Sequence, residues 1–321
     1  MQYIYEALLF LYNHMLQKKI ITIVGPTASG KSDFAVAIAR YINAHKKILG
    51  VAGAEIISAD SRQVYRGLNI GAGKITVKEM KGIPHHLLDV ASPSHTYTVA
   101  RYQKAAQKII TQLQKKNIVP ILCGGTGFYI DAVLYGYIFP AVKPNVSLRK
   151  KLETITTEKL FALLSKKDPT RAALIDHFNR RRLIRALEII EATKKPIPPL
   201  PKQACYNALI IGIRPNASTL TSRIHTRLIK RMKQGMVVEV RRLHRGGISW
   251  KRLDSLGLEY RFIARFLQGI VVKQDMLLQL ESEINKFAKR QMTWFKKNKE
   301  IVWMEKADVG KAQLLVKKFL I

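Results

Sequence analysis

One glycine-rich turn constrains the fold of this chain more than any other part of its sequence. The turn follows an apolar, β-branched run at residues 20–24 and precedes a segment whose apolar residues recur at helical spacing. It fits the pattern GxxxxGK[ST] with Gly25, Pro26, Thr27, Ala28, Ser29, Gly30, Lys31 and Ser32. Backbone N–H groups of such a loop surround phosphate oxygens, the lysine adds a positive charge, and the Ser32 hydroxyl can coordinate Mg²⁺. The sequence therefore predicts a P-loop that binds a diphosphate or a triphosphate.

Further apolar runs predict the sheet to which this loop belongs. Residues 54–57, 118–122 and 208–213 are expected to form strands, and residues 99–114 have the pattern of an amphipathic helix. Continuous apolar strands separated by helices are typical of a parallel sheet that is covered on both faces. We therefore expect an α/β fold, a P-loop NTPase-like parallel sheet flanked by helices, with ligands bound where the strands end.

A change of composition after Pro140 predicts the domain organisation. Residues 147–193 are highly charged and helical in pattern, and they lead into a proline-rich segment that cannot form a helix or a central strand. The strand expected after this segment returns the chain to the sheet. We therefore predict an N-terminal extension at 1–17, a P-loop core domain made of 18–140 and 204–321, and an inserted helical subdomain at 141–203.

The charge of the chain indicates what it binds. The 321 residues include 55 Lys and Arg against 22 Asp and Glu, a net charge of +33. A compact protein with this excess is typical of one that binds a polyanion, nucleic acid above all, although a lysine-rich proteome would also produce it. Cys123 and Cys205 lack the spacing of a zinc site or a disulfide framework. No segment has the pattern of a signal peptide or a membrane span, so we expect a cytoplasmic monomer that does not associate with a membrane.

Two polar residues at predicted strand ends are candidates for catalysis. Asp60 follows the second predicted strand, where a carboxylate can bind Mg²⁺ through water, accept a proton, or cap a helix. Thr126 lies in a Gly-Gly-Thr-Gly turn after the third predicted strand and either meets Asp60 across the same crevice or serves only the turn. His85 and His86 are adjacent, so in a strand they point to opposite faces and are expected to be structural.

Three arginines recur at a spacing of four residues. Arg223, Arg227 and Arg231 would lie on one stripe of a predicted helix. Such a stripe can face one phosphate-bearing ligand, or it can be a solvated helix surface.

Several motifs together resemble the tRNA dimethylallyltransferase family. Its version of the P-loop matches residues 25–32, and its second motif matches 57–67 almost residue for residue. Further matches follow in the family's order at 82–89, 124–130, 181–188 and 288–295. The resemblance covers roughly residues 20–295.

This resemblance implies a P-loop fold with a helical insertion and a specific reaction. The expected reaction transfers a dimethylallyl group from dimethylallyl diphosphate to N6 of adenosine 37, next to the anticodon of tRNAs that read codons beginning with U. Asp60 would be the general base, Thr126 would assist it, and Lys31, Arg227 and a Ser32-bound Mg²⁺ would neutralise the departing diphosphate. The tRNA anticodon stem-loop would contact Asp60, Ser61, Arg62, Gln63, Thr126, Arg181, Arg182, Leu183, Ile184, Arg185, Lys289, Arg290 and Gln291.

The chain departs from the family pattern at three places. The usual Gly-Thr-Ala-Lys-Pro is Gly71-Ala72-Gly73-Lys74-Ile75 in this sequence, the usual Gly-Tyr is Gly257-Leu258, and the usual Thr-Arg before the last motif is Asn285-Lys286. A P-loop kinase of nucleotides or small molecules is the alternative that the loop alone allows, and a nucleic-acid-binding protein without catalysis is a further one.

The RNA and kinase hypotheses predict different responses to salt. If the protein contacts six or more RNA phosphates, its affinity for an anticodon stem-loop should fall by ~10³ or more between low and moderate salt, because counterions are released on binding. Filter binding at increasing KCl concentration measures the slope. A flat response would contradict the RNA interpretation of the charge.

Overall fold

A computed structural model describes residues 19–199 and 204–321, which form two compact units. One unit consists of the chain up to Gly136 together with Ala204–Ile321, and the other is Tyr137–Gln203. The predicted N-terminal extension lies outside the described residues. Each unit is considered by itself below.

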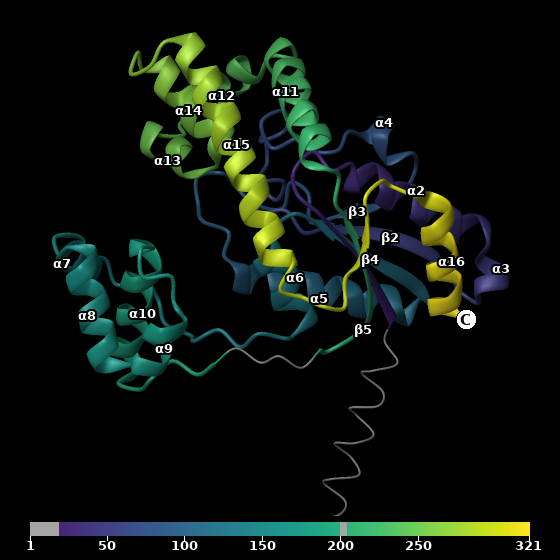
Figure 1. The fold of residues 1–321 in the computed structure, drawn as a ribbon, viewed down its shortest axis with the longest axis horizontal. Coiled ribbons are helices and arrows are strands. Elements are labelled where there is room, and N and C mark those ends of the chain that lie inside the picture. Colours follow the sequence, from purple (N-terminus) through teal and green to yellow (C-terminus); the bar gives the residue numbers. More distant parts are fainter. Residues whose placement is uncertain (1–18, 200–203) are drawn as a thin grey trace, which may run out of the picture. The chain divides into compact units, whose positions relative to one another are not determined.

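The first unit is built on a six-stranded parallel sheet (Figure 1). Its strands are β1 (Lys19–Val24), β2 (Gly53–Ser58), β3 (His85–His86), β4 (Ile118–Gly124), β5 (Asn207–Ile213) and β6 (Val302–Met304), in the order β3-β2-β4-β1-β5-β6. In the register, Ile21 pairs with Ile121 on one side and with Leu209 on the other. The predicted α/β fold is confirmed, and β5 returns to the sheet beside β1.

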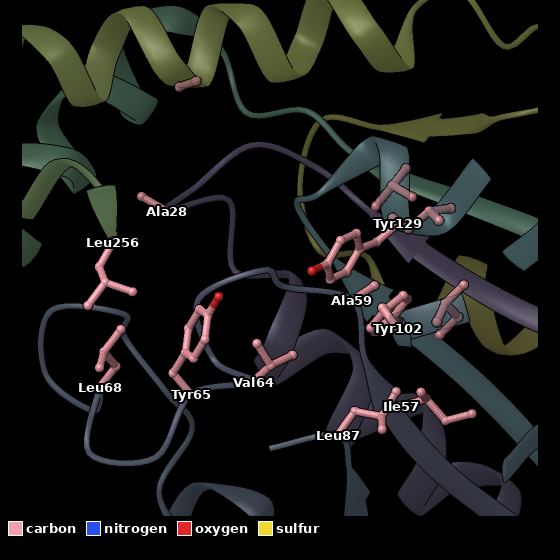
Figure 2. Packing of buried hydrophobic residues seen from close by; sticks show 14 of the residues in the cluster. Ala28, Ile57, Ala59, Val64, Tyr65, Leu68, Leu87, Tyr102, Tyr129 and Leu256 are labelled. Atoms are coloured by element: carbon pink, nitrogen blue, oxygen red, sulfur yellow. The ribbon is translucent and has the colours of Figure 1, made fainter. Parts of the chain in front are cut away.

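Helices cover both faces of this sheet because its strands are apolar on both sides. Ile21 and Ile23 pack with α2 (Lys31–Ala44) and α16 (Val309–Leu320), whereas Ile20 and Val24 belong to the cluster that includes α5 (Val99–Lys115) and α6 (Gly127–Leu134). In the second cluster the rings of Tyr102 and Tyr129 stack at 4.0 Å beside Ile57 and Ala59, at the end of β2 (Figure 2). The short helices α3 (Lys46–Leu49) and α4 (Val77–Met80) complete the connections on the β2 side.

The C-terminal part of this unit is a group of helices that extends from the sheet. It comprises α11 (Ala217–Lys233), α12 (Met236–Arg245), α13 (Trp250–Ser255), α14 (Leu258–Leu267) and α15 (Lys273–Phe295). Leu253, Tyr260 and Met276 are buried between them. In the described part of the chain, no helix is long and apolar enough to cross a membrane.

The second unit consists of four helices around a core of its own. They are α7 (Val146–Glu153), α8 (Thr157–Lys167), α9 (Pro169–Leu174) and α10 (Arg180–Thr193). Leu152, Leu160, Leu164, Leu183 and Leu187 form the centre of this core. Side chains at Asn145, Thr156 and Asp168 cap the starts of successive helices, as their residue types favour.

A buried carboxylate ties the second unit together. Glu188 on α10 accepts hydrogen bonds from Arg149 at 2.8 and 2.9 Å, from the Asn145 N–H at 2.6 Å, and from Arg185. Burial alone would raise the pKa of Glu188, but these donors outweigh it and lower that pKa from 4.5 to about 2. The ionised form is therefore the one that stabilises this unit.

We expect the Glu188→Gln variant to lower the free energy of unfolding of this unit by about 2 kcal/mol at neutral pH, because two arginines lose the buried carboxylate that pairs with them. The depressed pKa means that the contribution is complete above pH 4.5 and is lost as the pH falls towards 2. Hydrogen exchange of the α10 amides measures it. Glu191→Gln is the control, since that carboxylate is 47% exposed and pairs only with Lys167 and Lys194; equal protection in both variants would contradict the assignment.

Candidate functional site

The P-loop connects β1 to α2 in the conformation that its sequence requires. A Cβ atom at Gly25 would lie 2.6 Å from the Ile213 carbonyl oxygen, so β5 approaches too closely for any side chain there. Ala28 and Gly30 both adopt positive φ, at 62° and 89°, which folds the loop back on itself. Gly30 is the N-cap of α2 and provides no side-chain cap, so the first amides of the helix are available to an anion.

A cavity of about 730 Å³ lies in front of this loop. Elements distant in sequence line it: the P-loop and α2, the ends of β2 and β4, the segment 71–75, and helices α11 and α14. Its charged lining residues are Lys31, Asp33, Asp60, Arg62, Glu79, Arg223, Arg227, Arg231 and Glu259. The expected ligand site at the carboxyl edge of the sheet is therefore a cavity, and its charged lining includes both cations and carboxylates.

The predicted arginine stripe on α11 faces this cavity. Arg223 donates to the Ser29 carbonyl of the P-loop at 3.3 Å. Burial, followed by the charge of Arg231, lowers the pKa of Arg227 to about 10, and burial also lowers the pKa of Lys31. Both lowered pKa values show that these cations have too little negative charge nearby to offset their burial. An anionic ligand would supply that negative charge.

Arg231, at the far end of the stripe, has a different environment. It forms an ion pair with Glu259 on α14 at 3.4 Å and donates to the Gly71 carbonyl at 3.4 Å. Burial raises the pKa of Glu259, while the charge of Arg231 opposes that rise. Glu259 was not a candidate in the sequence, because no motif marked it there.

Asp60 lines the cavity, and Thr126, which is not among the lining residues, bonds to the turn that begins at Asp60. Asp60 accepts the N–H groups of Arg62 at 2.8 Å and Gln63 at 3.4 Å through Oδ1, and Thr126 Oγ1 accepts the Ser61 N–H at 3.0 Å. Asp60 thus caps a turn through one oxygen, and no hydrogen bond to Oδ2 forms within the described part of the chain. A Cβ at Gly124 would lie 2.1 Å from the Ala59 carbonyl oxygen, so glycine there allows the ends of β2 and β4 to come together.

Gln291 connects α15 to both sides of the site. Its Oε1 accepts the Thr27 N–H of the P-loop at 2.8 Å, and its Nε2 donates to the Gly125 carbonyl, beside Thr126, at 2.7 Å. The side chain is buried, and a Cβ at Gly125 would lie 2.4 Å from its Nε2. Nearby, Trp294 donates to Asp131 at 2.8 Å and packs on Gly127. The structure thus gives Gln291 a positioning role, and its predicted contact with RNA stays a prediction.

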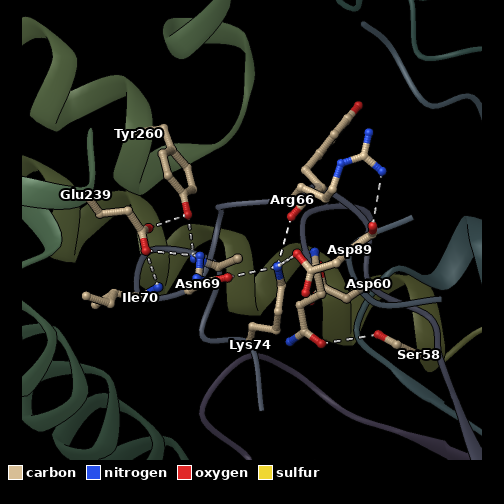
Figure 3. A network of polar contacts seen from close by, with 12 residues as sticks. Ser58, Asp60, Arg66, Asn69, Ile70, Lys74, Asp89, Glu239 and Tyr260 are labelled. Atoms are coloured by element: carbon tan, nitrogen blue, oxygen red, sulfur yellow. Dashed lines mark hydrogen bonds and ion pairs between the residues drawn. The ribbon is translucent and has the colours of Figure 1, made fainter. Parts of the chain in front are cut away.

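The segment between Asp60 and Lys74 is held in place by a polar network (Figure 3). The buried Glu239 of α12 accepts N–H groups from Asn69, Ile70 and Gly71 at 3.0, 2.7 and 3.0 Å, and the Tyr260 hydroxyl at 2.8 Å. On its other side, Lys74 donates to Asn69 and to Asp89. Glu239 was missed in the sequence, although a carboxylate between the buried Met236 and Val240 was a signal.

The remaining predicted RNA-binding residues divide by exposure. Arg181 and Arg182 on α10 and Lys289 and Arg290 on α15 are exposed. Leu183 and Ile184, in contrast, are buried in the core of the second unit, so their side chains have a packing role. Arg185 pairs with Glu188 and donates to the Val142 carbonyl at 2.9 Å. The predicted contacts of these residues with RNA stay predictions.

The residues present fit a magnesium ion that a diphosphate would share. Mg²⁺ usually keeps several waters and binds through one or two protein oxygens together with substrate phosphates. Ser32 supplies such an oxygen beside the first amides of α2, and the described residues contain no cluster of metal-ligating side chains that would hold an ion alone.

The two adjacent histidines are structural, as their hydrogen bonds show. His86 bonds to Glu55 at 2.6 Å, and His85 bonds to the Ile83 carbonyl at 2.8 Å. Burial raises the pKa of the Cys123 thiol to about 12, so that thiol is neutral.

Comparison with known proteins identifies the family. The model of the IPP transferase family matches residues 63–298. The chain belongs to the tRNA dimethylallyltransferase, or IPP transferase, family. It is 40% identical to "tRNA dimethylallyltransferase 1" of Geotalea uraniireducens over 89% of this chain and 92% of that protein. It is 36% identical to the tRNA dimethylallyltransferase of Syntrophomonas wolfei over 93% and 95% of the two chains.

Solved structures of this family have the same fold. The tRNA isopentenylpyrophosphate transferase of Bacillus halodurans superposes with a TM-score of 0.70 at 32% identity, covering 95% of this chain and 97% of that one. A eukaryotic dimethylallyltransferase acting on tRNA superposes with a TM-score of 0.72 at 22% identity, covering 92% and 77% of the two chains. The second likeness concerns the fold alone.

The Gln291→Met variant tests the positioning role. Methionine has a similar shape but leaves the Thr27 N–H and the Gly125 carbonyl without their partner, so the P-loop loses its fixed position. We expect an affinity for Mg²⁺-pyrophosphate about 10-fold lower by calorimetry, since buried unsatisfied groups cost about 1–3 kcal/mol. Gln268→Met is the matched control, because Gln268 bonds only to Ala264 on its own helix. Equal affinities in the two variants would show that Gln291 does not position the loop.

Proposed function

We propose that the protein transfers the dimethylallyl group of dimethylallyl diphosphate to N6 of adenosine 37, beside the anticodon of tRNAs that read codons beginning with U, and releases diphosphate. One observation carries this proposal. A single cavity is lined by the P-loop, by the arginine stripe and by Asp60, whose turn Thr126 holds through the Ser61 N–H. Family membership indicates the reaction. In this cavity, cations can stabilise the departing diphosphate and a carboxylate can accept the proton from N6.

The cationic side of the cavity suits the leaving group. When the bond between the allylic carbon and the bridging oxygen breaks, the diphosphate keeps the electron pair and gains negative charge. The free amides at the start of α2, together with Lys31, Arg223 and Arg227, are positioned to stabilise it. Mg²⁺ bound at Ser32 would add positive charge to the same diphosphate oxygens. The P-loop in this proposal holds a group that departs, and no phosphoryl group is transferred.

The opposite side suits the acceptor. The N6 nitrogen forms the new bond to the allylic carbon and must then lose a proton. Asp60 can accept that proton through Oδ2 while Oδ1 remains bonded to the Arg62 and Gln63 amides. Thr126 holds the turn that carries Asp60 through the Ser61 N–H. Fixing both reactants in one cavity supplies much of the rate acceleration expected for such a reaction.

The acceptor base has to leave its stack to enter the cavity, and basic residues suit the surrounding RNA. Arg62 lines the cavity next to Asp60. Lys289 and Arg290 are exposed on the helix that carries Gln291, and Arg181 and Arg182 are exposed on the insertion. We propose that these side chains contact the phosphates and the anticodon loop of the tRNA. In this proposal, the net charge of +33 contributes to tRNA binding. In this proposal the protein acts in the cytoplasm as a monomer.

Label transfer tests the function. Purified protein, Mg²⁺ and radiolabelled dimethylallyl diphosphate are incubated with an anticodon stem-loop that carries adenosines at positions 36–38. We expect label in the RNA that disappears when adenosine 37 is replaced by guanosine. ATP turnover on a small acceptor, with no label in RNA, would identify the kinase alternative instead.

Two substitutions at Asp60 separate its two roles. Asp60→Asn keeps an acceptor oxygen for the Arg62 amide but cannot take a proton, whereas Asp60→Ala removes both properties. If Asp60 is the general base, both variants should transfer about 10²-fold to 10⁴-fold more slowly in single-turnover assays. Near-parental transfer by Asp60→Asn would show that the carboxylate serves only the turn.

A further inference from the structure

The arginine stripe of α11 ends in a pair that the proposed reaction does not use. Arg223 and Arg227, like Lys31, form no ion pair within the described residues, whereas Arg231 pairs with Glu259. Glu259 lies in the first turn of α14 and lines the same cavity. Its neighbour Tyr260 bonds to the buried Glu239 at 2.8 Å, so the start of α14 is fixed with respect to α12. The carboxylate is therefore held at the end of the cationic wall.

Gly73 makes room for this pair. A Cβ atom at Gly73 would lie 1.6 Å from Arg231 Nη2 and 3.0 Å from Arg227 Nη2. The backbone at Gly73 has φ of 55°, which glycine adopts without strain, and its carbonyl accepts from Gln63 at 3.2 Å. Two of the three departures from the family pattern, at 71–75 and at 257–258, border the Arg231–Glu259 pair.

We propose that Glu259 is a specificity-determining residue, which holds Arg231 away from the bound anion and thereby selects a diphosphate over a triphosphate at the P-loop. The inference rests on the proposed function, in which the P-loop binds the donor diphosphate. Among the cations of the P-loop and the stripe, Lys31, Arg223 and Arg227 then face the anion without an ion pair in the described residues, and Glu259 neutralises Arg231. A further phosphate extending along the stripe would gain no free guanidinium and would approach a carboxylate of like charge.

This arrangement discriminates by repulsion as well as by attraction. P-loops of this pattern bind triphosphates in many proteins, so a chain that uses a diphosphate benefits from a group that disfavours the longer anion. A carboxylate in a partly buried site repels an added phosphate more strongly than one in open solvent. The diphosphate subsite lies towards the other end of the stripe, because Arg223 contacts the P-loop itself, two helical turns before Arg231.

The Glu259→Gln variant tests the inference. Calorimetry with Mg²⁺ and either inorganic pyrophosphate or inorganic tripolyphosphate gives two dissociation constants for the full-length protein, and their ratio is the readout. We expect the ratio to shift about 10-fold or more towards tripolyphosphate, as one charge-assisted contact is gained and one repulsion is lost. Asp254→Asn is the matched control, because Asp254 pairs with Arg261 and Arg265 outside the cavity lining.

Two further variants keep the test decisive. The charge-conserving Glu259→Asp should retain the parental ratio, and Arg231→Gln combined with Glu259→Gln should remove most of the gain, since the released arginine is its source. An unchanged ratio in Glu259→Gln, or an equal change in Asp254→Asn, would overturn the inference. Failure of the proposed function would give a different result. No label would appear in RNA, although the ratio of the two dissociation constants would still differ between Glu259→Gln and the parental protein.

Discussion

The positive charge gathered in front of the P-loop is the constraint on which the site depends. Lys31 and Arg227 are cations whose pKa values are lowered by burial, and Arg223 and Arg231 belong to the same wall. Like charges held together in a partly buried cavity oppose folding until an anion joins them. In the absence of an anion, the surrounding network of buried carboxylates and amides maintains the arrangement. A bound diphosphate therefore balances positive charge that the fold holds together at a cost.

That arrangement is maintained by residues that do not face the ligand. Gln291 fixes the P-loop to the turn that carries Thr126, and Glu239 fixes the segment 69–71 that Arg231 contacts. Each bridges elements more than a hundred residues apart in sequence. The geometry of the cavity thus depends on the helices of the C-terminal half as much as on the P-loop.

Local patterns were sufficient to predict four strands of the six-stranded sheet, the P-loop and the arginine stripe, whereas β3 and β6 are too short to give an apolar run. In each case the information lies within one element: an apolar run, a glycine-rich turn, or a spacing of four. The proximity of the turns that carry Asp60 and Thr126 was also foreseeable, because the ends of parallel strands meet at one edge. Gln291 was predicted to face RNA, since nothing in its own helix shows that its amide reaches Thr27 and Gly125. Leu183 and Ile184 entered the RNA-binding set through a motif, although apolar residues at that spacing are typical of a helix core.

The Arg231–Glu259 pair shows why a P-loop alone does not identify a reaction. The loop provides amides and a lysine that accept any phosphate chain, so the length of the chain must be set elsewhere. In this molecule the limit is at the far end of α11, where the absence of a side chain at Gly73 admits an arginine and α14 supplies its carboxylate. A kinase needs its cations on the phosphate farthest from the nucleoside, which is the position that Glu259 makes unfavourable. In its proposed role, the pair thus disfavours the phosphate that a kinase would transfer.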